Sequence, residues 1–328
     1  MQIVIYGAGN IGREALADIG RENVLCFVDQ EKSGELDGCP IYKLKDIPIA
    51  DEDEVLFLIT PRRYRREIAD TLLQAGYHRF VLYTHVRGGG TARPLDADEW
   101  GEIYNQRILD QVVSDVHKQR RSSWSKEMLR LTRPGERVLE IGCGSGATTL
   151  QLAAENRICT AIDYSKESIC LVRRAANVLS LSVETRLTDA RQELPFADDA
   201  FDVVFQAGLL EHFERAERVR LLRLWQRVGR TMVSLIPNAN SIAYHAGKFL
   251  QEQAGDWEYG MELPQATMKD EFIEAGYQQI REYTIGLKDA FSFLPEQHYL
   301  RIALERWFTD HPEPDYGQGY LLCTIGEK

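Results

Sequence analysis

The sequence predicts an α/β protein with two Rossmann-like domains, each built on a largely parallel sheet. Short apolar strands alternate with helical stretches throughout the chain, and a glycine-rich turn between a strand and a helix occurs once in each half. The chain has 328 residues, which is long for one domain. Residues 87–94 contain three consecutive glycines and a proline, so we place the boundary near residue 90 and predict domains 1–90 and 91–328.

Composition indicates an ordinary globular protein, with 44% hydrophobic and 27% charged residues. No stretch approaches a membrane span in length and hydrophobicity, and a net charge of −11 argues against a nucleic-acid partner. Six cysteines without a Cys-x-x-Cys pair indicate buried free thiols in a reducing compartment. The chain opens into a strand rather than a secretory leader, so we expect a cytoplasmic protein. No cluster of histidine, cysteine and carboxylate residues has metal-ligand spacing, so no metal site is predicted.

The first half reads as one small unit in which strands and helices alternate. Such alternation is typical of a parallel, doubly wound sheet. The predicted elements are the strand Gln2–Tyr6, the helix Arg13–Ile19, the strands Asn23–Val28 and Val55–Ile59, the helix Arg62–Gln74 and the strand Arg79–Tyr83.

The first strand runs into a Gly-x-Gly-x-x-Gly turn, formed by Gly7, Gly9 and Gly12 with Asn10 between them. Asp29 ends the next strand, where a carboxylate can bind ribose hydroxyls. The motif alone suggests NAD, but about 85 residues make half of a dinucleotide-binding fold, and no hydride-transfer apparatus is visible in the sequence. The turn and its neighbouring segments resemble the small N-terminal domain of bacterial sugar acyltransferases, which implies a nucleotide-sugar ligand. Tight strand–helix packing without a ligand is the alternative.

The second half begins with a helical pattern over residues 98–118 and then contains a second glycine-rich turn. The predicted order is an apolar strand over 138–141, the turn 142–146, the helix 147–154, and a strand over 158–162 that ends at Asp163. Glycines in the turn let a backbone pass close to a ligand, and some of them require a positive φ angle. A carboxylate at Asp163 can accept both hydroxyl protons of a ribose. These features predict a nucleotide-type site.

The order Glu-x-Gly-x-Gly-x-Gly over 140–146 resembles the cofactor signature of the class I S-adenosylmethionine-dependent methyltransferases, and its last glycine differs in spacing from the dinucleotide pattern. Segments 187–190, 194–205 and 209–213 resemble later motifs of that family, so the match covers about 137–237. The resemblance implies S-adenosyl-L-methionine as the cofactor. The residues that it assigns to the cofactor site are Glu140, Gly142, Cys143, Gly144, Gly146, Asp163, Tyr164, Asp189, Ala190 and Gln206.

The same resemblance implies a role for several of these side chains. Glu140 supports the amino-acid portion of the cofactor, Asp163 takes the ribose hydroxyls, and Asp189 with Ala190 meets the adenine edge. Gln206 is expected to follow the fourth strand, where the backbone approaches the methionine moiety. Tyr164 either packs on adenine or is exposed, and both options stay open.

Candidates for catalysis follow the fourth and fifth strands of this domain. Glu211 and His212 come just after the fourth strand, and an imidazole near neutrality can accept a proton from the methyl acceptor. This Glu-His pair is also widespread in the family with a packing role. Tyr244 and His245 follow the fifth strand, on the usual substrate side, and are the next candidates.

The C-terminal stretch predicts the remaining strands of the second sheet. Residues 231–235, 277–284 and 319–325 read as strands. The class I fold implies a seven-stranded sheet whose last strand is antiparallel, and the final run is well placed for it. Residues 288–318 are rich in aromatic side chains and read as a helical insertion.

The leading functional hypothesis is an S-adenosylmethionine-dependent methyltransferase that acts on a small molecule, such as a sugar or nucleotide-sugar intermediate. One alternative is an NAD(P)-dependent oxidoreductase that uses the N-terminal turn, and another is a noncatalytic nucleotide-binding module. The expected partner is a small-molecule acceptor, with neither nucleic acid nor membrane, and a homodimer is one possible assembly.

Overall fold

The computed structural model describes residues 2–48, 55–61, 64–83, 97–254, 257, 259–312 and 315–328. The chain divides into two compact units, residues 1–92 with 251–258 and residues 93–250 with 259–328. The predicted linker, 87–94, lies outside the described residues. Among the described residues, no helix combines the length and hydrophobicity needed to cross a bilayer.

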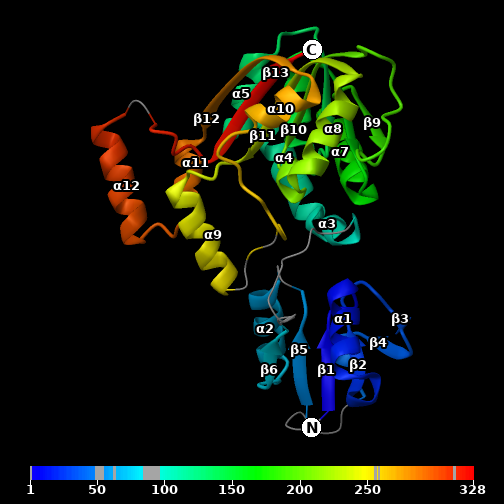
Figure 1. The fold of residues 1–328 in the computed structure, drawn as a ribbon. Helices are drawn as coiled ribbons and strands as arrows, with labels where there is room; N and C mark the ends of the chain where they lie inside the picture. The colour runs from blue at the N-terminus through cyan, green and yellow to red at the C-terminus, as the bar shows by residue number, and fades with distance from the viewer. Residues whose placement is uncertain are drawn as a thin grey trace. The chain divides into compact units, whose positions relative to one another are not determined.

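The N-terminal unit holds a six-stranded sheet with the order β3-β4-β2-β1-β5-β6 (Figure 1). All pairs are parallel except β3–β4, a short hairpin at the sheet edge that the sequence analysis did not predict. Its elements are β1 (Gln2–Tyr6), α1 (Asn10–Ile19), η1 (Arg21–Asn23), β2 (Val24–Val28), β3 (Gly34–Leu36), β4 (Cys39–Tyr42), η2 (Leu44–Asp46), β5 (Val55–Ile59), α2 (Arg65–Gln74) and β6 (Phe80–Leu82).

Alternating side chains along β1 build two separate cores, one on each face of this sheet. Val4 and Tyr6 pack with Leu72 of α2, whereas Ile5 packs with Leu16 of α1. Because successive strand residues point to opposite faces, a strand covered on both sides must be apolar throughout. The continuous apolar run of β1 meets this requirement.

The C-terminal unit holds a seven-stranded sheet with the order β12-β13-β11-β10-β7-β8-β9 (Figure 1). The last strand in the chain, β13, pairs antiparallel with both of its neighbours, while all the other pairs are parallel. The predicted seven-stranded sheet with an antiparallel last strand is therefore confirmed. The strands are β7 (Arg137–Ile141), β8 (Ile158–Asp163), β9 (Val183–Leu187), β10 (Phe201–Ala207), β11 (Gly229–Pro237), β12 (Gln278–Ile285) and β13 (Leu321–Glu327).

Helices cover both faces of this sheet. Trp225 of α8 and Phe272 of α10 lie in one core, and Met128 of α5 and Leu152 of α6 lie in the core of the opposite face. The helical elements are α3 (Ala97–Ile103), α4 (Gln106–His117), α5 (Ser123–Leu131), α6 (Ala147–Ala154), α7 (Lys166–Leu179), η4 (Leu210–His212), α8 (Arg215–Gln226), α9 (Ile242–Ala254), α10 (Lys269–Ala275), α11 (Leu287–Ser292) and α12 (Tyr299–Asp310).

The single helix predicted over residues 98–118 is wrong, because the structure has two helices there, α3 and α4. Asn105 separates them: its side chain accepts hydrogen bonds from the backbone N–H groups of Arg107 at 3.1 Å and Ile108 at 3.3 Å. An asparagine that satisfies the first free N–H groups of a helix is a strong N-cap. The apolar period continues through the break, which is why periodicity alone did not reveal it.

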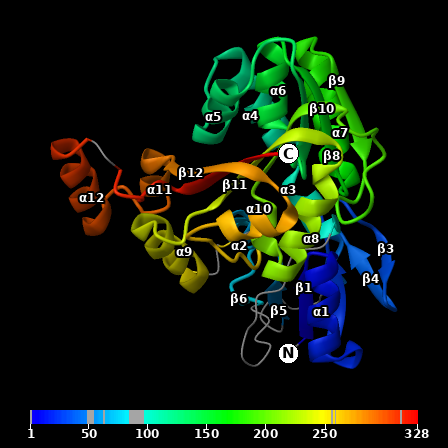
Figure 2. The ribbon, with the colours of Figure 1, turned by 45° about the horizontal axis from the view of Figure 1, so that its top comes forward.

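The aromatic-rich stretch 288–318 holds most of α11 and all of α12. Phe291 of α11 and Phe308 of α12 share a small core with Ala243 of α9. Both ribbon views show α9, α11 and α12 next to one another at the β12 end of the sheet, opposite β9 (Figures 1 and 2).

Candidate functional site

The glycine turn between β7 and α6 lies at the point where the strand order reverses, because β8 and β10 flank β7 on opposite sides. In open α/β sheets, such switch points leave a crevice at the carboxyl ends of the strands. Gly142, Gly144 and Gly146 have φ angles of +67°, +52° and +65°. A Cβ at Gly144 would overlap the hydroxyl of Tyr104, and one at Gly146 would overlap Val172. The turn therefore depends on glycine at these positions.

Glu140 ties the strand before the turn to the helix after it. Its buried carboxyl accepts hydrogen bonds from the Thr149 backbone N–H at 3.2 Å and from the Thr149 hydroxyl. Burial raises the pKa of Glu140 to about 8. Glu140 thus holds the shape of the turn from within the core.

Exchanging Glu140 for Gln is expected to flatten the pH dependence of stability between pH 5 and pH 8. The folded state keeps a proton that the unfolded state loses above about 4.5, so stability falls as pH rises through this window. Each pH unit then lowers the free energy of unfolding by up to about 1.4 kcal/mol. Urea unfolding at pH 5 and pH 8 measures this slope in the wild type and the variant. Equal slopes would contradict the assignment.

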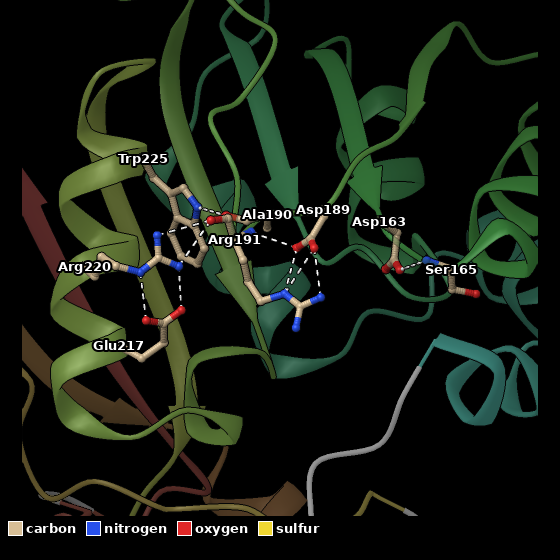
Figure 3. Close-up of polar contacts among 8 residues, drawn as sticks. All are labelled: Asp163, Ser165, Asp189, Ala190, Arg191, Glu217, Arg220 and Trp225. Carbon is tan, nitrogen blue, oxygen red and sulfur yellow. Dashed lines mark hydrogen bonds and ion pairs between the residues drawn. The ribbon is translucent and has the colours of Figure 1, made fainter. Parts of the chain in front are cut away.

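Asp163 ends β8 and holds the turn from the other side. One carboxylate oxygen accepts the Gly144 N–H at 2.9 Å. The other accepts the Ser165 N–H at 2.8 Å (Figure 3). Burial raises the pKa of this carboxyl, while backbone hydrogen bonds from Ser165, Gly144 and Tyr164 act against the shift. A carboxylate has about four acceptor positions, so these donors do not occupy all of them. Cys143 is buried inside the same turn.

Asp189 is held by an arginine that the sequence analysis did not consider. Its carboxylate pairs with Arg191 at 2.8 Å, and this side-chain hydrogen bond lowers the pKa of Asp189 (Figure 3). The adjacent Ala190 carbonyl accepts the indole N–H of Trp225 at 2.9 Å. Arg191 also lies 5.9 Å from the ring centre of Tyr164, which brings Tyr164 to the same edge of the site.

Gln206 lies inside β10, which extends to Ala207, so the prediction that it follows the strand is wrong. The continued parallel pairing with β11 keeps residues 206 and 207 in the ladder. The fully buried Gln206 amide donates to the Ser234 hydroxyl at 2.6 Å, and its oxygen accepts the Leu209 N–H at 2.9 Å. Its side chain therefore fixes the loop that follows β10.

Two aromatic residues near the turn were not predicted as site residues. Tyr104 follows α3 and places its hydroxyl against Gly144, and Trp100 of α3 stacks near Tyr104 with ring centres 6.4 Å apart. Trp100 also meets His212 edge-on at 5.5 Å. These side chains connect the glycine turn with the segment after β10. The helical pattern was visible in the sequence, but the direction of these side chains was not.

A buried polar cluster lies beyond β10, and we define it as Glu211, His212, Tyr244, Lys248 and Glu262. Glu262 accepts the Tyr244 hydroxyl at 2.5 Å and pairs with Lys248 at 3.1 Å. Burial, and then the charge of Glu262, raises the pKa of Glu211, whereas burial lowers the pKa of His212. Glu262 and Lys248 were missed because they are far from Glu211 in the sequence.

His245 lies at the solvent-exposed edge of this cluster, where its ring meets that of Tyr244 edge-on at 5.1 Å. Its side chain is exposed, and its Nε2 atom lies 2.9 Å from the carbonyl oxygen of Ala239. Consecutive helical residues point in directions about 100° apart, so one of the two faces the core and the other faces solvent. The structure therefore buries Glu211, His212 and Tyr244 together and leaves His245 exposed beside Tyr244.

The N-terminal turn is built on the same plan as the second turn. The Asp29 carboxylate accepts the Ala8 N–H at 2.9 Å and also the N–H groups of Glu31 and Lys32. Burial acts to raise the pKa of Asp29, but these backbone donors outweigh it and hold the pKa below its usual value. A Cβ at Gly12 would overlap the Gly7 carbonyl oxygen, so this glycine serves close strand–helix packing. Gly9 is the N-cap residue of α1, and Asn10 begins the helix.

Comparisons with known proteins agree with this geometry. Residues 138–231 match a family described as a methyltransferase domain. Curated demethylmenaquinone methyltransferases from Bacillus cereus and Bacillus anthracis are 30% identical over 100 residues, which cover 29% of this chain and 42% of the relative. The chain thus matches less than half the length of these relatives. Residues 138–231 are therefore similar to a methyltransferase domain, and the comparisons do not favour an oxidoreductase.

Two solved structures are similar to the chain at low sequence identity. A possible histamine N-methyltransferase from Thermotoga maritima is 18% identical with a TM-score of 0.45, and the match covers 68% of this chain and 100% of that one. The [4+2]-cyclase SpnF is 17% identical with a TM-score of 0.46, and the match covers 74% and 99%.

Proposed function

We propose that this chain transfers a methyl group from S-adenosyl-L-methionine to a small-molecule acceptor. One observation carries the proposal: a turn with no side chains at three positions is held open at a switch point by two buried carboxyls, Glu140 and Asp163. The bare turn leaves room for a ligand backbone to approach, and the remaining acceptor positions of Asp163 suit ribose hydroxyls.

Most residues of the proposed cofactor site would contact the cofactor directly, and one would support the site indirectly. Gly142, Cys143, Gly144 and Gly146 shape the wall along the amino-acid portion. Asp163 meets the ribose, whereas Asp189, Ala190 and Tyr164 form the adenine edge, which the contacts of Arg191 and Trp225 keep in place. Gln206 supports the site indirectly, through its hydrogen bond to the Leu209 N–H.

Methyl transfer is a displacement in which the acceptor atom bonds to the methyl carbon while the carbon–sulfur bond breaks. It requires a short approach in a site that excludes water. We infer that Trp100 and Tyr104 close the cofactor side, because Tyr104 lies against Gly144. Glu211, His212 and Tyr244 face the acceptor side, and of the catalytic candidates His245 is the least supported because it is exposed.

The direct test combines two measurements on the full-length chain. Native mass spectrometry of freshly purified protein checks for bound S-adenosylmethionine, its demethylated product or a nicotinamide cofactor. Methyl-labelled cofactor is then incubated with hydroxyl- and amino-bearing sugars and nucleotide sugars. Transfer of label, lost in the Asp163→Ala variant, supports the proposal. A bound nicotinamide cofactor together with alcohol or aldehyde turnover would support the oxidoreductase instead.

For the N-terminal unit we propose a nucleotide-sugar site at Gly7–Gly12. The turn precedes α1, whose N-cap residue Gly9 has no side-chain hydrogen bond, so backbone N–H groups and the helix dipole favour an anion there. Lys32 is near, with its amine 3.1 Å from the Ala8 carbonyl oxygen. Arg62 and Arg63, which begin the predicted helix Arg62–Gln74, lie outside the described residues, and Arg65 begins α2.

Titration of uridine and thymidine diphosphate sugars into the full-length chain tests the nucleotide-sugar site. Binding that Gly9→Asp abolishes and that leaves cofactor binding unchanged would support it. If none of these ligands shifts the amide signals of Gly7, Gly9 and Gly12, the unit is structural. A cytoplasmic location and a homodimer stay predictions, which cell fractionation and light scattering would check.

A further inference from the structure

Three potential metal ligands converge at the carboxyl end of β10. One imidazole nitrogen of His212 and one carboxylate oxygen from each of Glu211 and Glu262 lie within 4.8 Å of one another. Glu211 and His212 belong to η4. A backbone hydrogen bond of 2.7 Å from the Leu263 N–H to the Glu211 carbonyl oxygen joins η4 to the segment that carries Glu262. The backbone therefore fixes the spacing of the three groups.

Glu211 is the group in this cluster that lacks a partner. Its residue is 2% exposed, and its Oε2 atom has no hydrogen-bond partner among the described residues. A buried polar atom without a partner is rare in native proteins, because it loses its hydrogen bonds to water and gains none within the protein. Such an atom indicates that a proton, a water molecule or a cation completes the cluster.

His212 makes the kind of backbone hydrogen bond that is common in metal-binding histidines. Its Nδ1 atom lies 2.6 Å from the carbonyl oxygen of Met261, so Nδ1 carries the proton and donates it to that oxygen. In this tautomer Nε2 carries the lone pair that could bind a metal, and the Gly208 backbone also acts on the ring. Metal-ligating histidines commonly donate their other N–H to a backbone carbonyl or carboxylate in this way, which fixes the tautomer and the ring orientation.

The charges around the cluster leave room for one more cation. Lys248 is the resident cation, with its amine 3.1 Å from Glu262 and a side chain that is 12% exposed. Arg218 also acts on Glu211, but it is already paired with Glu271 at 2.6 Å. One ammonium group faces two carboxyl groups, so ionisation of both would leave one negative charge, which a bound cation would compensate. Buried charges of this kind are normally paired or bound to a metal.

We propose that Glu211, His212 and Glu262 bind one divalent transition-metal ion. Two carboxylates and an imidazole form a ligand set that suits Mn²⁺ or Zn²⁺ better than Ca²⁺. Three protein ligands leave positions open on the ion, which oxygen groups of a small molecule could occupy. The inference does not rest on the proposed methyl transfer. It replaces the prediction of no metal site, because Glu262 lies about fifty residues from Glu211 and spacing in the sequence could not reveal it.

The test uses the full-length chain with MnCl₂ and ZnCl₂ as probes. Equilibrium dialysis and the electron paramagnetic resonance of free Mn²⁺ should show one ion per chain. Glu211→Gln and Glu262→Gln should each weaken binding at least tenfold. Lys248→Met should strengthen it severalfold, because the ammonium group then no longer competes for Glu262. Asp202→Asn, which alters a half-exposed ion pair with Arg137, is the matched control and should change nothing.

Two results would overturn the metal site. One is a dissociation constant for the metal above millimolar. The other is metal binding that the two Gln variants leave unchanged, because the ions would then bind to the acidic surface of the protein instead. Circular dichroism melting identifies variants that fail to fold. Should both Gln variants fail, Lys248→Met decides, because a site elsewhere would not be strengthened by it. Binding of S-adenosylhomocysteine in the same samples separates loss of the metal from failure of the proposed function.

Discussion

Replacing Gly146 by alanine should lower the free energy of unfolding by about 2–5 kcal/mol and abolish cofactor binding. Gly146 has a φ angle of +65° and is the N-cap of α6, and its added Cβ would overlap Val172 of α7. Backbone strain and overpacking therefore act together, and relief by moving α7 would distort the turn. Urea unfolding and calorimetry with S-adenosylhomocysteine measure the two losses.

Gly135 offers a matched control for this substitution. Its φ angle is +86°, but a Cβ there would have no heavy atom within 4 Å. Gly135→Ala should thus show backbone strain alone, about 1–2 kcal/mol, with cofactor binding intact. If both variants lose the same stability and both still bind, close packing of the turn on α7 is not what requires glycine at Gly146.

Removing Glu271 alone should destabilise the C-terminal unit by about 3–5 kcal/mol, because it leaves a buried arginine without its partner. Arg218 and Glu271 join α8 to α10 at 2.6 Å, and their side chains are 4% and 6% exposed. Arg218 also donates to the Phe213 carbonyl oxygen at 2.7 Å, next to η4. Glu271→Ala should therefore also loosen the loop that carries Glu211 and His212.

Chemical unfolding of three variants and the wild type checks this prediction. Glu274→Ala removes an exposed pair between the same two helices, with side chains that are 55% and 50% exposed, and should change stability by less than about 1 kcal/mol. The double variant Arg218→Met with Glu271→Leu should regain most of the loss, because neither buried charge remains. A double variant no more stable than Glu271→Ala would contradict the electrostatic explanation.

The elements that were predicted well are those that local patterns determine. Apolar runs placed β1, β7, β8 and β13, and the second glycine turn marked where α6 begins. The first helix was predicted to begin at Arg13, but α1 begins at Asn10, inside the first turn. The β3–β4 hairpin was overlooked although its turn carried a signal: Asp37 and Gly38 have φ angles of +48° and +75°, as an Asp-Gly hairpin turn requires. The N-cap at Asn105 was hidden by an apolar period that continues through it.

The site residues also divide into those that local patterns reveal and those that only long-range packing brings together. Gly144 and Asp163 belong to one strand-turn-helix-strand unit, β7-α6-β8, and the hydrogen bond between them follows from the geometry of that unit. Glu262 and Lys248 reach the cluster through long-range packing, which a single sequence does not encode in its spacing. The ion pair of Asp189 was overlooked although it is local. Its partner Arg191 is two residues away, so their opposite charges could have predicted the pair.

Calorimetric titration of S-adenosylmethionine and S-adenosylhomocysteine into the full-length chain tests the central claim most directly. The wild type should bind both, and Asp163→Ala should weaken binding by about 1.5–3 kcal/mol, the value of a charge-assisted hydrogen bond. Asp29→Ala removes the carboxylate that plays the same part in the N-terminal turn and should leave this binding unchanged. Absence of binding by the wild type, or equal loss in both variants, would contradict the assignment of the cofactor to the turn between β7 and α6.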